Sequence, residues 1–283
     1  MAPRTTPTAR QQRLGAELRK LREKAGLTAR EAGALLGGNQ ARISNIETGR
    51  IPVSADRIRT LACNYDCQDK KLIDALASMP SGRTRHWWEE YRGVLPPGML
   101  DLAELEHYAV ELRTAQTSSI PGLLQTVAHA RVVFEQSFPP LPPPEIEHRV
   151  SHRIKRQAVL FRDSPLPYTA IIHEAALRMQ FGGTEVTRAQ LAHIMEISER
   201  ENVTVLVIPF TAGAFPGSGQ TFSYARGSIP QLDTVHLDQS HGVVFLDAEA
   251  QLLKYRGIMD RVQAVSLSAD SSRDFLRSIL RNL

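Results

Sequence analysis

Along the first 80 positions, hydrophobic residues recur at the spacing of short amphipathic helices. Leu14, Leu18 and Leu21 fall on one face of a helix whose other faces are mostly basic. Gly26 interrupts this pattern and ends the helix. We therefore expect short helices in this region that pack through narrow apolar stripes.

The stretch that follows predicts two helices joined by a sharp turn. Thr28 and Glu31 have the spacing of a capping box, which starts a short helix. Gly37 ends this helix, because glycine reaches positive φ without a Cβ clash. Asn39 then caps the next helix. The apolar residues that the first of these two helices is expected to bury are Ala32, Leu35 and Leu36.

The helix after Asn39 has one apolar face and one face of short polar residues. Ile43 and Ile46 share the apolar face, which can pack on the two preceding helices. The opposite face suits the major groove of DNA, since Gln and Asn can bond an adenine edge and Ala can contact a thymine methyl. Asn39 and nearby arginines can hold phosphates. The residues expected to contact DNA are Thr28, Arg30, Asn39, Gln40, Ala41, Arg42, Ser44, Asn45 and Arg50. This arrangement predicts a helix-turn-helix.

The remainder of the chain predicts helices followed by strands. Leu102, Leu105, Tyr108, Ala109 and Leu112 repeat at helical spacing. Short β-branched runs then indicate strands, with helices between the first two and at the end, Asp270 to Asn282. The predicted strands are YTAIIH, VTVLVIP, TFSYAR, TVHLD and GVVFLD.

These patterns predict an all-α N-terminal helix-turn-helix domain followed by a mixed α+β (α/β) C-terminal regulatory domain. Residues 1–9 are expected to form a disordered tail, residues 10–80 the helix-turn-helix domain, 81–100 a linker and 101–283 the C-terminal domain. A Pro-Ser-Gly sequence at positions 80–82 breaks the helical pattern where we place the boundary.

Charge is distributed unevenly between these two parts. Residues 1–60 carry 12 Lys/Arg against 5 Asp/Glu, a net charge of +7, whereas the remaining residues carry 22 against 25, a net charge of −3. A basic N-terminal part suits a polyanionic partner, since bound lysines and arginines displace counterions from phosphates. An unevenly charged, solvated surface is the alternative.

Several pairs of reactive residues have ordinary structural explanations. His148 and His152 are one helical turn apart, but no third ligand stands at a matching spacing. His173 and Glu174 at a strand end suit caps better than an acid/base pair. Cys63 and Cys67 are interpreted as small packing residues. We therefore expect no catalytic residue, metal or cofactor, and no enzymatic activity.

A set of candidate residues for binding a partner or effector lies after the predicted boundary. Trp87, Trp88 and Tyr91 form an aromatic group, and Gln125 and Thr126 can face a pocket or a partner. Packing in the core is the alternative for the aromatic residues.

Two resemblances cover nearly the whole chain. Leu27 to Ala62, LTAREAGALLGGNQARISNIETGRIPVSADRIRTLA, resembles the XRE (Cro/C1-type) helix-turn-helix regulators. Ala29 stands where that family usually has a glutamine, so one phosphate contact is expected to be absent or supplied by Arg30. The segments LEHYAVELRTAQTSSIPGLLQT, HRIKRQAVL, HEAALR and VTVLVIP resemble the DUF5753-like C-terminal domain of actinobacterial regulators. That resemblance implies an antitoxin-like role with a small protein encoded by a neighbouring gene.

Together these observations favour a DNA-binding transcription regulator whose C-terminal domain binds a partner protein or effector. An antitoxin-like protein that sequesters a small partner and a small-molecule-responsive repressor are the alternatives. A homodimer is expected because one short recognition helix reads few bases. Without a long apolar run or a signal peptide, we expect no membrane partner, and a cytoplasmic protein associated with the nucleoid when bound to DNA.

Overall fold

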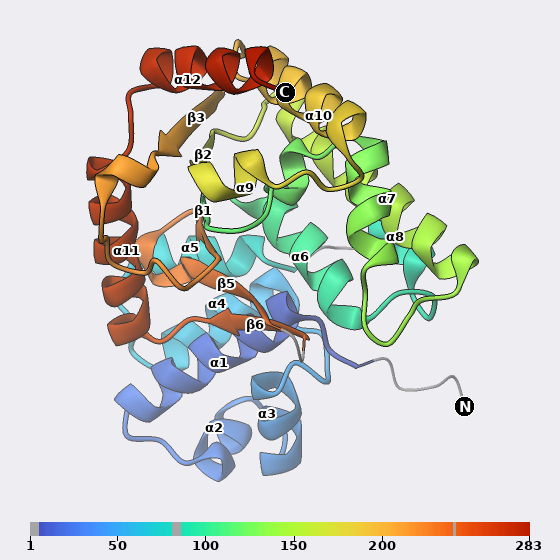
Figure 1. Cartoon of the computed structure of the whole chain (residues 1–283). Coiled ribbons are helices and arrows are strands. Elements are labelled where there is room, and N and C mark those ends of the chain that lie inside the picture. The colour runs from blue at the N-terminus through green and yellow to red at the C-terminus, as the bar shows by residue number, and fades with distance from the viewer. Residues whose placement is uncertain (1–5, 81–85, 240–241) are drawn as a thin grey trace. The chain divides into compact units, whose positions relative to one another are not determined.

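The structure, a computed structural model, describes residues 6–80, 86–239 and 242–283 of the 283. These residues form two compact units, Met1–Glu89 and Glu90–Leu283 (Figure 1). The division falls inside the segment expected to be a linker. Each unit is described separately below, as the N-terminal unit and the C-terminal unit.

The N-terminal unit is helical, as the sequence predicts. Its helices are α1 (Ala9–Lys24), α2 (Ala29–Leu35), α3 (Gln40–Glu47), α4 (Ala55–Asn64) and α5 (Lys70–Ser78). A side chain starts each of these helices by accepting a bond from a backbone N–H of the first turn. The capping residues are Thr8, Thr28, Asn39, Ser54 and Asp69.

The turn between α2 and α3 is fixed by two backbone hydrogen bonds at the end of α2, and the chain changes direction at Gly37. Gly37 has a φ of 64°, and its N–H donates to Ala34 O at 3.0 Å. The next amide, Gly38 N–H, donates to Gly33 O at 2.8 Å. This pair of bonds is a Schellman motif, which satisfies the last carbonyls of α2. The motif confirms that Gly37 ends the helix.

The core of the N-terminal unit is made of aliphatic residues from all five helices. Ile43 and Ile46 of α3 are buried as predicted, and Ile58 and Leu61 of α4 are buried as well. Leu35 is an exception, with 55% of its surface exposed. The prediction that α2 buries Leu35 is wrong, because α2 ends at that residue and its inner face is made by Ala32 and Gly33.

The C-terminal unit is built on a six-stranded mixed sheet in the order β3-β2-β1-β4-β5-β6. Strands β1, β2 and β3 are parallel, whereas β4 pairs antiparallel with β1, and β5 and β6 continue the antiparallel half. The strands are β1 (Glu111–Gln116), β2 (Tyr168–His173), β3 (Val203–Ile208), β4 (Phe222–Arg226), β5 (Thr234–Gln239) and β6 (Gly242–Leu246).

Helices cover both faces of this sheet (Figure 1). One face packs on α10 and α12 through residues such as Leu191, Ile194 and Leu276, and the other packs on α11 through Leu252 and Met259. The α-helices are α6 (Pro97–Tyr108), α7 (Val127–Glu135), α8 (Pro143–Arg156), α9 (Glu174–Arg178), α10 (Thr184–Ile197), α11 (Glu249–Ala264) and α12 (Ala269–Arg281), and the short 3-10 helices are η1 (Trp87–Tyr91), η2 (Gly122–Leu124), η3 (Gln157–Leu160), η4 (Phe210–Ala212) and η5 (Pro230–Leu232).

The sequence prediction differs from the structure in four further places. Leu112 belongs to β1 rather than to the preceding helix, since α6 ends at Tyr108. Helix α11 was not predicted. Of the predicted tail, residues 1–5 lie outside the described residues, whereas Thr8 caps α1 and Ala9 begins it. Cys63, interpreted as a packing residue, is exposed.

Candidate functional site

The surface of α3 carries the polar side chains that the sequence assigned to DNA. Gln40, Ala41, Arg42 and Ser44 are exposed, and Asn45 is partly exposed. These residues share the helix with Ile43 and Ile46, which are 1% and 3% exposed. Burial of the two isoleucines fixes the rotation of α3, so the short polar side chains must face outward.

The cations of the N-terminal unit fall into two groups. On α1, Arg13, Arg19 and Arg22 are each paired with a carboxylate. In contrast, Arg30 on α2, Arg42 on α3 and Arg50 after α3 make no ion pair within the described residues. The helix-turn-helix elements therefore carry unpaired positive charge that a phosphate could meet. Within the described residues, Lys24, Arg57, Lys70 and Lys71 of the same unit also make no ion pair.

Thr28 and Asn39 have structural roles that limit how they can contact DNA. The Thr28 hydroxyl donates to Glu31 Oε2 at 2.7 Å, and hydrogen bonds from Thr28 lower the pKa of the Glu31 carboxyl. Asn39 Oδ1 accepts from Arg42 N–H at 3.0 Å, which leaves the side-chain NH₂ of Asn39 as a donor. Asn39 can therefore cap α3 through its Oδ1 and, at the same time, donate a hydrogen bond to a phosphate through its NH₂ group.

A buried ion pair holds α3 against α1. Arg22 Nε donates to Glu47 Oε1 at 2.6 Å and Arg22 Nη2 to Glu47 Oε2 at 3.1 Å, while Arg22 Nη1 donates to Leu27 O at 2.6 Å. Both side chains are at least nine-tenths buried. This bidentate pair links the C-terminal end of α3 to the chain just before α2, and thereby holds α3 in place.

The aromatic residues proposed for a partner surface are mostly buried. Trp88 is 2% and Tyr91 is 5% exposed, whereas Trp87 is partly exposed. Trp88 stacks on His86 with ring centroids 4.4 Å apart, and Tyr91 Oη shares a hydrogen bond with Ser151 Oγ at 2.8 Å. These contacts support packing for Trp88 and Tyr91 and leave Trp87 the most accessible of the three.

The other two candidates occupy different places in the C-terminal unit. Thr126 caps α7, with its hydroxyl accepting from His129 N–H, and its own N–H donates to Gln190 Oε1 at 2.8 Å. Gln125 is 3% exposed and contributes to the wall of a pocket, where its Oε1 accepts from Arg153 Nη1 at 2.7 Å. Of these two residues, Gln125 lines this pocket.

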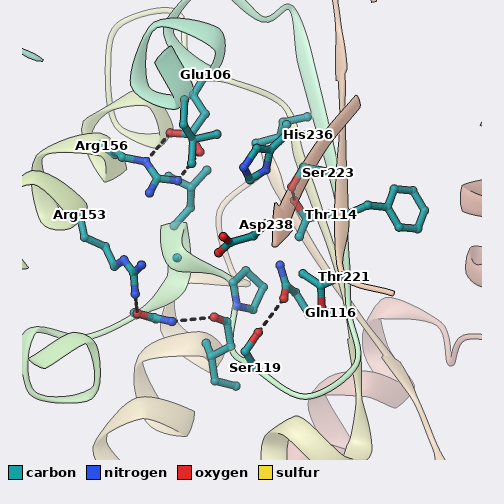
Figure 2. Close-up of a pocket in the computed structure, with 18 of the residues that line it drawn as sticks. Glu106, Thr114, Gln116, Ser119, Arg153, Arg156, Thr221, Ser223, His236 and Asp238 are labelled. Carbon is teal, nitrogen blue, oxygen red and sulfur yellow. Dashed lines mark hydrogen bonds and ion pairs between the residues drawn. The ribbon is translucent and has the colours of Figure 1, made fainter. Parts of the chain in front are cut away.

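This pocket lies between the sheet and helices α6 and α8 and has a volume of about 200 Å³. In Figure 2, Arg153 and Arg156 lie on one side and the sheet residues Thr114, Ser223 and His236 on the other. Apart from Gln125, the residues that line this pocket were not predicted from the sequence. The basic run HRIKR was visible on one predicted helix, but the strand positions that face it could be identified only from the sheet order.

The residues considered for catalysis act as caps or ion pairs in the structure. His173 Nδ1 accepts from Ala175 N–H at 3.2 Å at the start of α9. Glu174 accepts from Arg178 Nε at 2.6 Å and from Phe210 N–H at 2.8 Å. The described residues contain no group of three or more His, Cys, Asp or Glu placed to hold a metal. None of the helices in residues 6–80, 86–239 and 242–283 is both long and apolar enough to cross a membrane.

Comparisons with known protein families agree with this division. Residues 13–76 match a helix-turn-helix domain, and residues 99–278 match the domain of unknown function DUF5753. Both resemblances noted in the sequence are confirmed. No curated protein and no solved structure shows a significant match to the chain. The match to DUF5753 covers more than half of the chain. The chain therefore belongs to the DUF5753 family and carries a helix-turn-helix domain ahead of the family domain.

Proposed function

We propose that this protein is a sequence-specific DNA-binding transcription regulator that reads the major groove with α3. The observation that carries the proposal is the exposed polar face of α3 opposite its two buried isoleucines. The free arginines Arg30, Arg42 and Arg50 on the same elements support it, because phosphate contacts orient a recognition helix over the bases.

The test separates base reading from phosphate binding. Operator fragments are first selected from genomic DNA with the full-length protein. Gln40→Ala and Asn45→Ala are expected to weaken binding to the selected site by about 1–3 kcal/mol each and to leave binding to random DNA nearly intact. Arg50→Ala should weaken binding to both and reduce the slope of log affinity against log salt by about one unit.

A matched control is Gln68→Ala, which removes an exposed amide of the N-terminal unit that lies outside α2 and α3. It should bind both DNAs as the wild type does. Equal losses on specific and random DNA for Gln40→Ala and Asn45→Ala would contradict base reading by α3.

We further propose that the protein binds DNA as a homodimer in the cytoplasm and that its C-terminal unit modulates operator binding. Helix α3 has 8 residues and can contact only a few base pairs, so a second copy would supply the second half-site. A binding role rather than a catalytic one is supported by the capping and ion-pair roles of His173 and Glu174.

The C-terminal unit would act through a partner protein or a small effector. The partner version, including an antitoxin-like role with a small protein encoded nearby, is supported by the family resemblance. The effector version is supported by the pocket beside α8. Either ligand can shift operator binding only if it binds the DNA-competent and incompetent arrangements with different affinities, typically by about 5- to 150-fold.

A further inference from the structure

The pocket beside α8 lies where one face of the sheet changes from apolar to polar. On this face, β2 and β3 present Ala170, Ile172 and Val205, which belong to a hydrophobic core. On the other side of β1, this face carries the polar residues Ser223 on β4 and His236 on β5, which are neighbours in register, together with the apolar Ala225 and Phe245. A buried sheet face is normally apolar, so the two polar positions indicate that something polar lies against them.

Polar atoms in this pocket lack hydrogen-bond partners. His236 is 7% exposed, and its Nε2 is buried without a partner among the described residues. Figure 2 shows its ring directed toward the pocket. Burial, with a smaller effect of Arg156, lowers the pKa of His236 to about 3, so this imidazole is neutral at pH 7. Arg153 Nε is also buried without a partner. Such atoms are costly unless a ligand or water satisfies them.

The pocket contains one cation and one anion that make no ion pair with any described residue. Arg156 is neutralised by Glu106, which accepts from its Nε at 2.8 Å and its Nη2 at 2.5 Å. Arg153 makes no ion pair within the described residues; it bonds Gln125 and lies 4.1 Å from the Phe134 ring centroid. Asp238 also lines the pocket without an ion pair to any described residue.

These two charges lie on different elements that face the same cavity. Arg153 comes from α8 and Asp238 from β5, and Figure 2 shows the Asp238 carboxylate pointing toward the side of the arginines. Burial lowers the pKa of Arg153 to about 9, with Arg156 acting in the same direction, whereas Asp238 acts to raise it. The two groups are thus close enough to interact but are not in contact.

The size of the cavity limits what it can hold. A volume of about 200 Å³ corresponds to about seven water molecules at their share of liquid volume. This is below the range of about 300–1,000 Å³ that is usual for drug-sized ligands. The hydroxyls of Thr114, Ser119 and Thr221 add donors and acceptors to the wall.

We propose that this pocket binds a small zwitterion of the α-amino-acid class, with its carboxylate on Arg153 and its ammonium group toward Asp238. A monoanion alone would leave Asp238 opposing it, and a cation alone would leave Arg153 uncompensated. Neutral His236 and the wall hydroxyls bond the remaining polar atoms of the ligand. The proposal names a ligand class for the effector in the proposed function and rests on it for that role, although binding itself does not require DNA.

The test is calorimetric titration of the full-length protein, without DNA, with each of the twenty standard amino acids. At least one is expected to bind with a Kd below about 1 mM. For the tightest binder, two analogues are titrated, the amine that lacks the carboxylate and the acid that lacks the amino group. Each should bind about tenfold more weakly or worse, because each leaves one pocket charge unpaired.

Variants assign the two charges of the ligand to residues. Arg153→Gln should weaken amino-acid binding by about tenfold or more, and Asp238→Asn should make the acid that lacks the amino group bind as well as the amino acid. Arg149→Gln on α8 and Asp274→Asn on α12 are matched charge controls outside the pocket and should bind as the wild type does. Asp238 is exposed, so its variant tests the proposal even where Arg153→Gln fails to fold.

Three results would overturn the proposal. The first is that no amino acid binds at concentrations up to about 10 mM. The second is that neither Arg153→Gln nor Asp238→Asn changes the binding of the amino acid. The third is that the wild-type protein binds the acid that lacks the amino group as tightly as it binds the parent amino acid. Since DNA is absent from the titration, each of these results leaves the proposed DNA-binding function to its own test.

Discussion

At the scale of single residues, the ion pair Arg22–Glu47 holds α3, the proposed recognition helix, against α1. Both side chains are buried and joined by two hydrogen bonds. Removing one partner leaves the other charge buried and uncompensated, which costs about 3–5 kcal/mol in comparable pairs. Glu47→Ala is therefore expected to lower the free energy of unfolding of the N-terminal unit by about that amount, measured by urea unfolding of the full chain.

The control for this prediction is the exposed pair Arg59–Asp56, whose Asp56 side chain is almost fully solvated. Asp56→Ala should change the free energy of unfolding by less than about 1 kcal/mol. If Glu47→Ala lowered the free energy of unfolding by no more than Asp56→Ala does, the buried Arg22–Glu47 pair would contribute nothing to stability.

At the scale of elements, the close approach of α2 to the start of α3 depends on Gly33. A Cβ at this position would lie 2.6 Å from the Asn39 carbonyl carbon, which is backbone and cannot move without displacing α3. Gly33→Ala is therefore expected to reduce operator affinity by tenfold or more, although alanine favours helix. Affinity is measured on the selected operator at constant salt.

The exposed neighbour Ala34 supplies the control, since Ala34→Ser changes the same helix on its solvent side. It should keep operator affinity within about twofold, given the small effects of surface substitutions. If Gly33→Ala bound the operator as tightly as the wild type, the spacing of the two helices would not matter for DNA recognition.

At the scale of the whole molecule, the proposed dimer predicts how affinity depends on the C-terminal unit. The full chain should sediment as a dimer on an operator with two half-sites about one DNA turn apart. Residues 1–80 alone should bind this operator much more weakly, because the second contact is then no longer intramolecular. A full-length monomer bound to one asymmetric site would rule out the dimer.

The free energy of unfolding of the whole molecule should also fall as the pH is lowered, because buried neutral histidines take up protons when the chain unfolds. His152 is fully buried, and burial followed by repulsion from Arg156, Arg153 and Lys155 lowers its pKa to about 3 from an ordinary 6.5. Between these values the unfolded chain binds a proton that the folded chain does not, so folding stability falls as the pH falls below about 6.5. One such histidine contributes a slope of about 1.4 kcal/mol per pH unit.

His152→Gln should therefore make the decline in melting temperature of the full chain between pH 6.5 and pH 4 shallower than in the wild type. His148→Gln removes an exposed imidazole from the same helix and should retain the wild-type decline. Identical slopes for wild type and His152→Gln would show that His152 takes up no proton on unfolding.

Local sequence determined most of the N-terminal unit, because its helices start and end on signals within a few residues of each boundary. Thr28 and Asn39 each cap the helix predicted to follow them. The same spacing rules predicted which face of α3 is buried, and hence which of its side chains are exposed. Five of the six strands were also predicted from β-branched runs.

Only the tertiary structure revealed β1 and the pocket. The ELRTAQ sequence of β1 lacks a β-branched run and continues a helical spacing, and it is a strand because β2 and β4 pair with it on both sides. Arg153 is far in sequence from His236 and Asp238, and it meets them only because the sheet order places β5 beside β4 and α8 over that face. Caps and periodicity act within a few residues, whereas strand order is decided by long-range pairing, which no local pattern encodes.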